Sequence, residues 1–293
     1  MIEAATTLLG DIFRPGLAIL LVLLPLTVLE MKFGREDVSM ATRLKGLPFQ
    51  FVQLASFVIA GKIFVDLFQN LGIAPVVDPF GFVGGAAVVV VVLLWKDFIA
   101  YWAHRIAHSY YLWPFHAPHH APRYLSAINN HNHWTAPLFN LVIVAFPLAF
   151  VEQPEAAIWW VLALKKLHDG FTHSNVTFDM GPLKYLIVGP GFHRVHHSME
   201  EEHFDKNFSA MFTVWDVLFG TVYWHDANYR PPVGVADFPE PRFADWWFAP
   251  FTYWWNRLPG KPLHPAAKAR AQASARGDLY EFSEEAVVTV EPA

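Results

Sequence analysis

Hydrophobic residues form long uninterrupted runs in the first third of the chain. Residues 12–30, 49–73 and 80–95 are almost wholly apolar, and they approach the ~20 residues that a helix needs to cross a bilayer core. Runs of this length predict membrane helices rather than strands. We therefore expect three spanning helices before residue 96.

Two shorter apolar runs follow, at 138–151 and 156–164, separated by an acidic break that contains a proline. Each is short for a full span, so together they predict a tilted helical hairpin or a re-entrant pair. The fold class expected from the whole pattern is all-α. It is a multi-pass membrane helix bundle, with about four spans or three plus a re-entrant hairpin.

Basic residues in the connections orient the predicted spans. The connection 31–48 contains four lysines and arginines, whereas 74–79 contains none. The positive-inside rule then places 31–48 in the cytoplasm and 74–79 on the far side of the membrane. The third span returns to the cytoplasm at Lys96, so we expect a multi-pass membrane protein in which residues soon after Lys96 lie on the cytoplasmic face.

Three regions follow from these patterns. Residues 1–95 are expected to be membrane anchor helices. Residues 96–245 hold most of the histidines and include the predicted hairpin near 138–164. Residues 246–293 begin within an aromatic stretch typical of a membrane interface and end in an Ala-rich, charged tail that we expect to be mobile.

The composition agrees with a membrane protein. Of 293 residues, 54% are hydrophobic, 16% aromatic and 16% charged, and the mean hydropathy is +0.27, whereas soluble domains carry about 25% charged residues. A formal net charge of −5 gives no basic footprint for nucleic acid. The absence of cysteine excludes disulfides, thiolate zinc sites and iron–sulfur clusters.

Ten of the 15 histidines fall into four closely spaced groups. They are His104-x3-His108, His116-x2-His119-His120, His168-x4-His173 and His193-x2-His196-His197. Positions i, i+3 and i+4 share one face of a helix, so such groups can aim several ring nitrogens at one point. A lone buried histidine is usually a hydrogen-bonded core residue, but burying ten would leave many nitrogens in need of partners. The pattern predicts a metal site.

The number of histidines indicates two metal ions. One zinc ion takes four ligands, or three plus water, so ten histidines suit two ions that share about five each. Imidazole alone does not choose among zinc, iron, copper and nickel. The location favours a redox metal, because a site just below a bilayer faces acyl chains and sterols. Oxidising their unactivated C–H bonds requires such a metal and dioxygen.

The histidine groups and the residues around the last one resemble a known family. The fatty acid hydroxylase/sterol desaturase superfamily of integral-membrane non-haem diiron oxygenases carries HxxxH, HxxHH and a late HxxHH. This chain supplies 104-HRIAH, 116-HAPHH and 193-HRVHH, and the late group continues into the family-like pattern NF…WDVLFGT. The resemblance covers roughly residues 80–225.

The resemblance implies a cytosolic helical cap that holds a histidine-rich dimetal site, and it implies a set of metal ligands. Eight positions match the three motifs: His104, His108, His116, His119, His120, His193, His196 and His197. His168 and His173 match a less uniform histidine segment of the family. That pair is spaced i, i+5, which places its side chains on divergent faces of an ideal α-helix; a local wide turn or two separate metals would resolve this.

The resemblance also implies a reaction and partners. Two iron ions would activate dioxygen to hydroxylate or desaturate a lipid such as a sterol, fatty acyl or sphingoid chain, and zinc could replace iron in purified protein. Electrons would come from outside, because the sequence contains no dinucleotide-binding glycine motif and no haem-attachment motif. We therefore expect a ferredoxin or a cytochrome b5-like donor.

Some residues and two other functions stay open. His131, His133 and His203 could support the ligands or be structural, and Asp97, Asp169, Asp205 and Asp216 could accept the second ring N–H of a ligand histidine. The main alternative function is a zinc-dependent membrane hydrolase, which would need a general base beside one metal and no dioxygen. A metal-binding or transport protein is the other, although such a protein would carry ionisable ligands within its spans.

Overall fold

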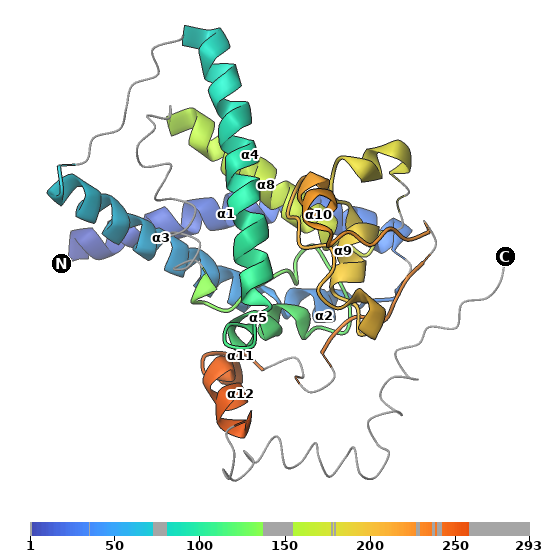
Figure 1. Ribbon diagram of the computed structural model, residues 1–293. Coiled ribbons are helices and arrows are strands. Elements are labelled where there is room, and N and C mark those ends of the chain that lie inside the picture. The colour runs from blue at the N-terminus through green and yellow to red at the C-terminus, as the bar shows by residue number, and fades with distance from the viewer. Residues whose placement is uncertain are drawn as a thin grey trace.

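The part of the chain that can be described is helical, which confirms the predicted all-α class (Figure 1). The computed structural model describes residues 2–34, 36–72, 81–136, 155–176, 178, 180–226, 229–235, 238 and 242–257. Extended pairing within these ranges is confined to isolated bridges, such as Ile187 with Phe212.

The α-helices, in chain order, are α1 (Ile2–Phe33), α2 (Met40–Leu44), α3 (Leu47–Asn70), α4 (Gly81–Ala107), α5 (Trp113–His120), α8 (Glu155–Thr172), α9 (Pro190–His196), α10 (Val214–Phe219), α11 (Phe243–Trp246) and α12 (Ala249–Arg257). Two 3-10 turns, Gly181–Tyr185 and Glu201–His203, flank α9.

Helices α1, α3 and α4 cover the three long apolar runs. By length and composition, one stretch of the described residues, Met40–Phe68, is suited to crossing a membrane, and 12% of its apolar window is buried. The number of spans therefore stays a prediction. The connection 74–79, most of the predicted hairpin (138–154) and the tail after Arg257 lie outside the described residues.

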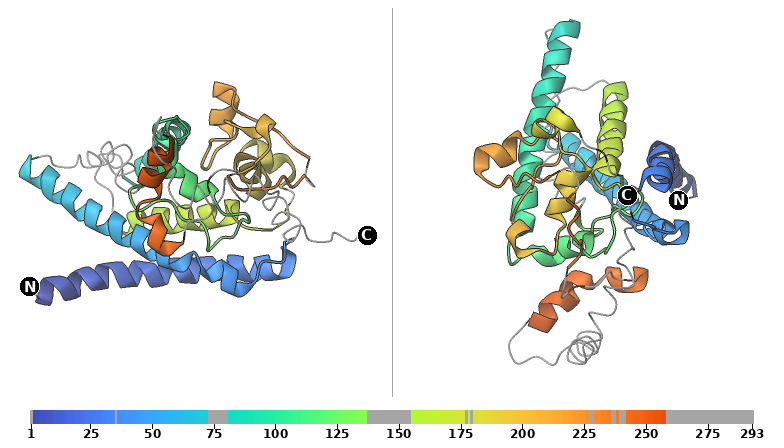
Figure 2. Two further views of the ribbon diagram at one scale, coloured as in Figure 1. Left: turned by 90° about the horizontal axis from the view of Figure 1, so that it is seen from below. Right: turned by 90° about the vertical axis from the view of Figure 1, so that its right-hand side faces the viewer.

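The described helices pack around the segments that carry the histidines. Helix α3 returns alongside α1, and α1 also packs on α8 (Figure 2). Leu23 and Leu26 of α1 contact Ala127 and Ile128. Gly170 permits this approach, because a Cβ there would lie 2.5 Å from the Leu23 side chain. A second apolar cluster joins α5 to α12, where Ala117 and Ala121 pack with Tyr253.

A buried acidic residue at the end of α1 fastens these layers together. The Glu30 carboxylate accepts the backbone N–H of Ala127 at 2.7 Å and that of Asn175 at 3.0 Å, and it pairs with Arg43. Breaking such a buried pair costs several kcal/mol because a charge is left without compensation. Glu30 thus ties α1 to the chain on either side of α8, close to His173.

Candidate metal centre

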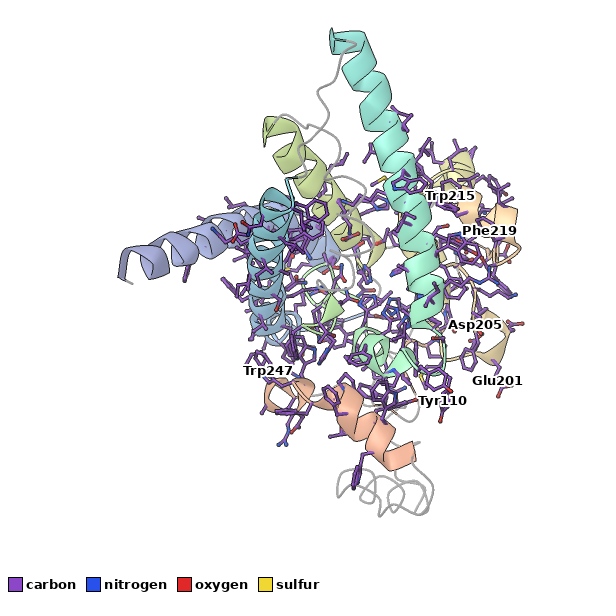
Figure 3. All side chains as sticks on the ribbon, turned by 60° about the vertical axis from the view of Figure 1, so that its left-hand side comes forward. Tyr110, Glu201, Asp205, Trp215, Phe219 and Trp247 are labelled. Atoms are coloured by element: carbon purple, nitrogen blue, oxygen red, sulfur yellow. The ribbon has the colours of Figure 1, made fainter. Side chains whose placement is uncertain are left out.

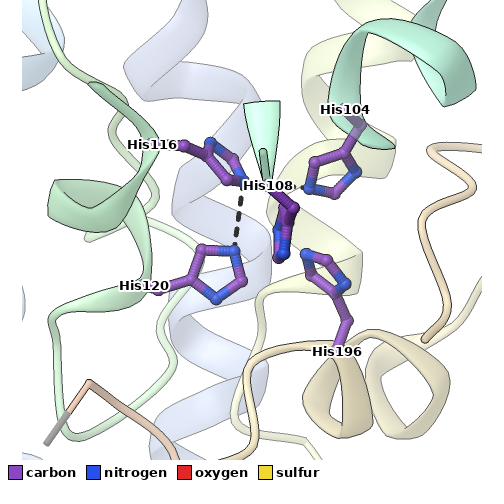
Figure 4. Close-up of side chains that lie close together, drawn as sticks. All are labelled: His104, His108, His116, His120 and His196. Carbon is purple, nitrogen blue, oxygen red and sulfur yellow. Dashed lines mark hydrogen bonds between the residues drawn. The ribbon is translucent and has the colours of Figure 1, made fainter. Parts of the chain in front are cut away.

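Nine of the ten predicted ligands gather in two groups deep in the protein. The first cluster comprises His104, His108, His116, His120 and His196, and the second comprises His119, His173, His193 and His197. Within each cluster, one ring nitrogen per residue lies within 4.8 Å of the others. The five side chains of the first cluster point toward a common centre (Figure 4).

Helix α4 delivers the first pair of histidines. It runs without interruption from Gly81 to Ala107, so the third apolar run continues directly into His104. His108 follows one turn later, and its backbone N–H bonds to the His104 carbonyl at 3.3 Å. Residues i and i+4 differ by about 40° around a helix, and both imidazoles therefore reach the same cluster.

The two H-x-x-H-H groups each divide their histidines between the clusters. On α5, His116 and His120 (i, i+4) join the first cluster and His119 joins the second. At the end of α9, His193 and His197 (i, i+4) join the second cluster and His196 joins the first. On a helix, position i+3 lies about 100° from i+4, so one short helix can serve two centres.

Backbone carbonyls orient four of the ligand rings. The Nδ1–H of His104 donates to Phe208 O at 2.7 Å and that of His196 donates to Lys206 O at 2.8 Å. In the second cluster, His119 donates to His131 O at 3.2 Å and His173 to Asp169 O at 2.7 Å. These bonds fix the tautomer, which leaves each Nε2 lone pair directed into its cluster.

The contact between His119 and His173 shows that the second cluster needs a positive charge. Their Nε2 atoms lie 3.2 Å apart, yet the single proton of each neutral ring is already donated through Nδ1. Two lone pairs therefore face each other, and that contact is repulsive unless a cation lies beside both. In the first cluster, Nε2 of His196 and of His108 are buried and make no hydrogen bond within the described structure.

Protonation does not relieve these contacts at neutral pH. Burial lowers the pKa of His104 to about 3 and that of His173 to about 4, because a charged ring loses its hydration in the interior. Burial, followed by the neighbouring histidines, holds the pKa of His116 and His193 well below 6.5. The rings are neutral, the form that binds a metal ion.

The nitrogen spacing suits a metal ion. Imidazole nitrogens lie about 2.0–2.1 Å from a bound ion such as zinc, so neighbouring ligands are roughly 2.9–3.4 Å apart in octahedral or tetrahedral geometry. In the first cluster, Nε2 of His116 lies 3.0 Å from that of His104 and 3.1 Å from that of His120. In the second, Nε2 of His193 lies 2.8 Å from that of His173 and 3.1 Å from that of His197. Both clusters have the donors and spacing to hold an ion.

His168 lies apart from both clusters. Its Nε2–H donates to the Val188 carbonyl at 3.1 Å, and it belongs to neither nitrogen group. The spacing explains the difference, because positions i and i+5 differ by about 140° around a helix. His173 follows directly after α8 ends at Thr172, and there its ring reaches the second cluster.

The remaining histidines of the region have other contacts. His131 supplies the carbonyl that orients His119, and its ring stacks on Phe49 with centroids 4.1 Å apart. His133 bonds to Thr135 Oγ1 at 2.8 Å and to Trp246 O at 3.1 Å, a structural role. His203 is buried beside Ser198, beyond the second H-x-x-H-H group.

Three of the four aspartates hold other partners than ligand rings. Asp216 is fully buried and accepts the backbone N–H groups of Phe208 and Ser209, each at 2.8 Å. Asp97 similarly accepts those of Met211 and Phe212, and the Asp169 side chain pairs with Lys165.

Among the four, Asp205 alone approaches a ligand ring, with Oδ1 3.6 Å from His108 Nδ1. Asp216 and Asp97 support the ligands indirectly, because they hold in place the segment whose Phe208 carbonyl orients His104. The sequence singled out these aspartates, but the carbonyls that they position carry no signal in the sequence.

Comparison with known proteins agrees with this geometry. Residues 89–221 match the family model described as fatty acid hydroxylase. That match contains all nine clustered histidines. Residues 89–221 therefore carry a fatty acid hydroxylase domain, which confirms the resemblance that the histidine motifs indicated.

Curated relatives in this superfamily are named as lipid hydroxylases and monooxygenases. An ornithine lipid hydroxylase of Rhizobium tropici is 34% identical over 150 residues, which are 50% of this chain and 45% of the relative. Human alkylglycerol monooxygenase is 31% identical over 127 residues (43% and 28%), and methylsterol monooxygenase 1-1 of Arabidopsis thaliana is 30% identical over 149 residues (48% and 47%). The matches span less than half the length of these relatives. No solved structure matches the chain.

Proposed function

We propose that this protein is an O2-dependent membrane oxidoreductase that hydroxylates a lipid through a diiron centre held by the two histidine clusters. The observation that carries the proposal is the pair of buried nitrogen clusters, in the second of which the lone pairs of His119 and His173 face each other without a proton between them. The relatives named as lipid hydroxylases and monooxygenases support the reaction class. Desaturation is the other outcome open to the same hydrogen abstraction.

The donor set favours a redox role over hydrolysis. The clusters consist of imidazoles, and among the described residues the aspartate carboxylate that approaches a ligand ring is that of Asp205, 3.6 Å from His108. A metal-dependent hydrolase needs a general base within hydrogen-bond reach of a water, and Asp205, whose side chain is 75% exposed, is poorly placed for that. Iron bound here would supply the electron chemistry with dioxygen that zinc does not provide.

The protein's own contribution is to position neutral ligands and exclude water. Four rings are held by backbone carbonyls, and ligand side chains such as His197 are almost completely buried. Hydroxylation adds one oxygen atom of O2 to a C–H bond and reduces the other to water, which consumes two electrons and two protons. We propose that a ferredoxin or a cytochrome b5-like protein supplies the electrons, and that the centre faces the cytoplasm.

The test is lipid mass spectrometry of cells that express the wild-type protein or the His173→Ala variant, grown under isotopically heavy dioxygen. A lipid that gains one heavy oxygen atom in wild-type cells alone supports hydroxylation, whereas loss of two hydrogen atoms supports desaturation. His225→Ala, at a histidine outside both clusters, is the matched control and is expected to resemble wild type. A lipid change that persists without dioxygen would refute the proposal.

A further inference from the structure

A third group of metal-ligating side chains lies just beyond the second H-x-x-H-H group. Glu200, Glu202 and His203 each place one ligand atom within 4.8 Å of the others. Glu202 and His203 belong to the 3-10 turn Glu201–His203, and Glu200 immediately precedes it. None of the three belongs to either histidine cluster, so the group is separate from the centre described above.

His203 is the buried member, and one of its nitrogens is left without a hydrogen bond. The residue is 1% exposed, and its Nδ1 lies 2.8 Å from Ser198 Oγ. Ser198 Oγ already accepts the Glu200 N–H at 3.0 Å, and its second lone pair can accept the Nδ1–H of His203. In the described structure Nε2 makes no hydrogen bond, although Glu202 Oε1 lies 3.5 Å away.

When the Nδ1–H is donated to Ser198, the Nε2 lone pair lies opposite the Glu202 carboxylate oxygen. That contact is unfavourable unless a positive charge lies between the two atoms. The two atoms make no hydrogen bond with each other, and a bound cation would compensate both.

Two tyrosines hold the carboxylates toward the ring. The Tyr223 hydroxyl donates to Glu202 Oε1 at 3.2 Å, and the Tyr229 hydroxyl donates to Glu200 Oε2. Their rings also pack against His203, with centroids 4.6 and 5.6 Å from it. The neighbouring Glu201 is exposed at the outer edge of this region (Figure 3).

We propose that Glu200, Glu202 and His203 form a third metal site, which binds a single divalent transition cation such as zinc. One imidazole, two carboxylates and a water make a tetrahedral set of this type. With metal–ligand distances of about 2.1 Å, two ligands of a tetrahedral ion lie roughly 3.4 Å apart, close to the 3.5 Å between His203 Nε2 and Glu202 Oε1. The carboxylate side chains are 36% and 62% exposed, which leaves a path for the ion and its water.

A cation bound here would stabilise the chain next to the second histidine cluster. The Ser198 that anchors His203 directly follows the ligand His197, and it forms a bridge with Val233. The tyrosines that orient the carboxylates come from residues 223–229. The site would therefore lock together the two stretches of chain that flank the metal centre, and it does not depend on which ions the histidine clusters hold.

The test measures zinc binding to the full-length protein after its histidine clusters have been loaded. Equilibrium dialysis at a series of free zinc concentrations, followed by elemental analysis, should show one further zinc ion per chain in the wild-type protein. Glu202→Gln keeps the shape of the side chain and should lower the affinity for this ion at least tenfold. Glu201→Gln makes the same change one residue away, outside the site, and should leave the affinity unchanged.

His203→Phe provides a second variant, because it removes the nitrogen but retains a ring between the two tyrosines. It should also lose the additional ion, and retention of the metal in the histidine clusters will show that it has folded. The proposal is overturned if the wild-type protein binds no further zinc, or if both site variants bind it as tightly as wild type. Equal weakening by Glu201→Gln and Glu202→Gln would also overturn it, since that result indicates diffuse adsorption to acidic side chains.

Discussion

Asp216→Asn should destabilise the protein and loosen one metal cluster while sparing the other. Asp216 Oδ1 accepts from Phe208 N at 2.8 Å and from Thr221 Oγ1 at 2.6 Å, and Oδ2 accepts from Ser209 N at 2.8 Å. An asparagine can keep two of these bonds with its oxygen, but it then turns an N–H₂ group toward the third donor.

The expected loss of stability follows from these three hydrogen bonds. A hydrogen bond to a charged acceptor contributes ~1.5–3 kcal/mol, and a buried donor left unpaired costs a further ~1–3 kcal/mol. We expect a loss of about 3 kcal/mol of folding free energy, which corresponds to a fall in Tm of roughly 5–10 °C for a protein of this size.

The effect on metal should be confined to the first cluster. Phe208 and Lys206 present the carbonyls that orient His104 and His196, whereas the carbonyls of His131 and Asp169 orient the second cluster. Displacing an outer hydrogen-bond partner of a ligand typically lowers metal affinity 10–100-fold. Chelator-driven release should therefore change from one slow phase to a fast phase and a slow phase of equal size.

The control is Asp245→Asn, the same substitution at an aspartate whose side chain is 55% exposed and pairs with Arg242. Exposed pairs contribute little to stability, so this variant should melt and release metal like wild type. If Asp216→Asn and Asp245→Asn melt at the same temperature, the buried carboxylate of Asp216 does not stabilise the segment that contains Phe208 and Ser209. If it accelerates release from both clusters equally, the two clusters are not oriented independently.

Three further predictions concern the ligands, pH and topology. His173→Ala should lower bound metal and abolish lipid oxidation, whereas His168→Ala should retain two ions per chain by elemental analysis; loss of an ion from His168→Ala would restore the ten-ligand set predicted from sequence. The metal-free protein should lose stability as pH falls below ~6.5, because the unfolded chain then binds protons that buried rings such as His104, with a pKa of about 3, do not; each such ring contributes about 1.4 kcal/mol per pH unit. Denaturant titrations at several pH values give the free energy of unfolding as a function of pH. The slope of that free energy against pH should be shallower for His173→Gln than for wild type, and an equal slope would contradict the assignment of His173 as a buried neutral ring. Cysteines introduced at the exposed Ser109 and Glu201 should react with an impermeant reagent from the cytoplasmic side, and one at Val77 from the opposite side; labelling of position 201 from outside would reverse the proposed orientation.

The sequence predicted the members of the centre better than their arrangement. Spacings of i, i+3 and i+4 identified eight of the nine histidines that cluster, because helical periodicity is a local property, and His173 was predicted from the less uniform group that it forms with His168. The i, i+5 spacing of His168 and His173 indicated that both side chains could not face one site from the same helix. In the structure, only His173 of the two reaches a cluster. The division of each H-x-x-H-H group between two clusters was not predicted, since it depends on how α5 and α9 face each other.

The parts that sequence reasoning missed depend on contacts between distant segments. Every residue has a backbone carbonyl, so nothing in the sequence marked those of Phe208, Lys206, His131 and Asp169 as partners of ligand rings. Glu30 ended an apolar run and could have been a surface residue. Its role depends on the backbone N–H groups of Ala127 and Asn175, which come from distant segments and converge on its carboxylate.

The division of ligands also determines which motions can reach each ion. Helices α5 and α9 each contribute to both clusters, and the rings of His120 and His197 stack across the boundary with centroids 4.2 Å apart. The separation of the two clusters is therefore set by two helices rather than by loops. Helix α4 and the end of α8 each serve one cluster. A shift of α4 would therefore alter the first cluster and leave the second unchanged.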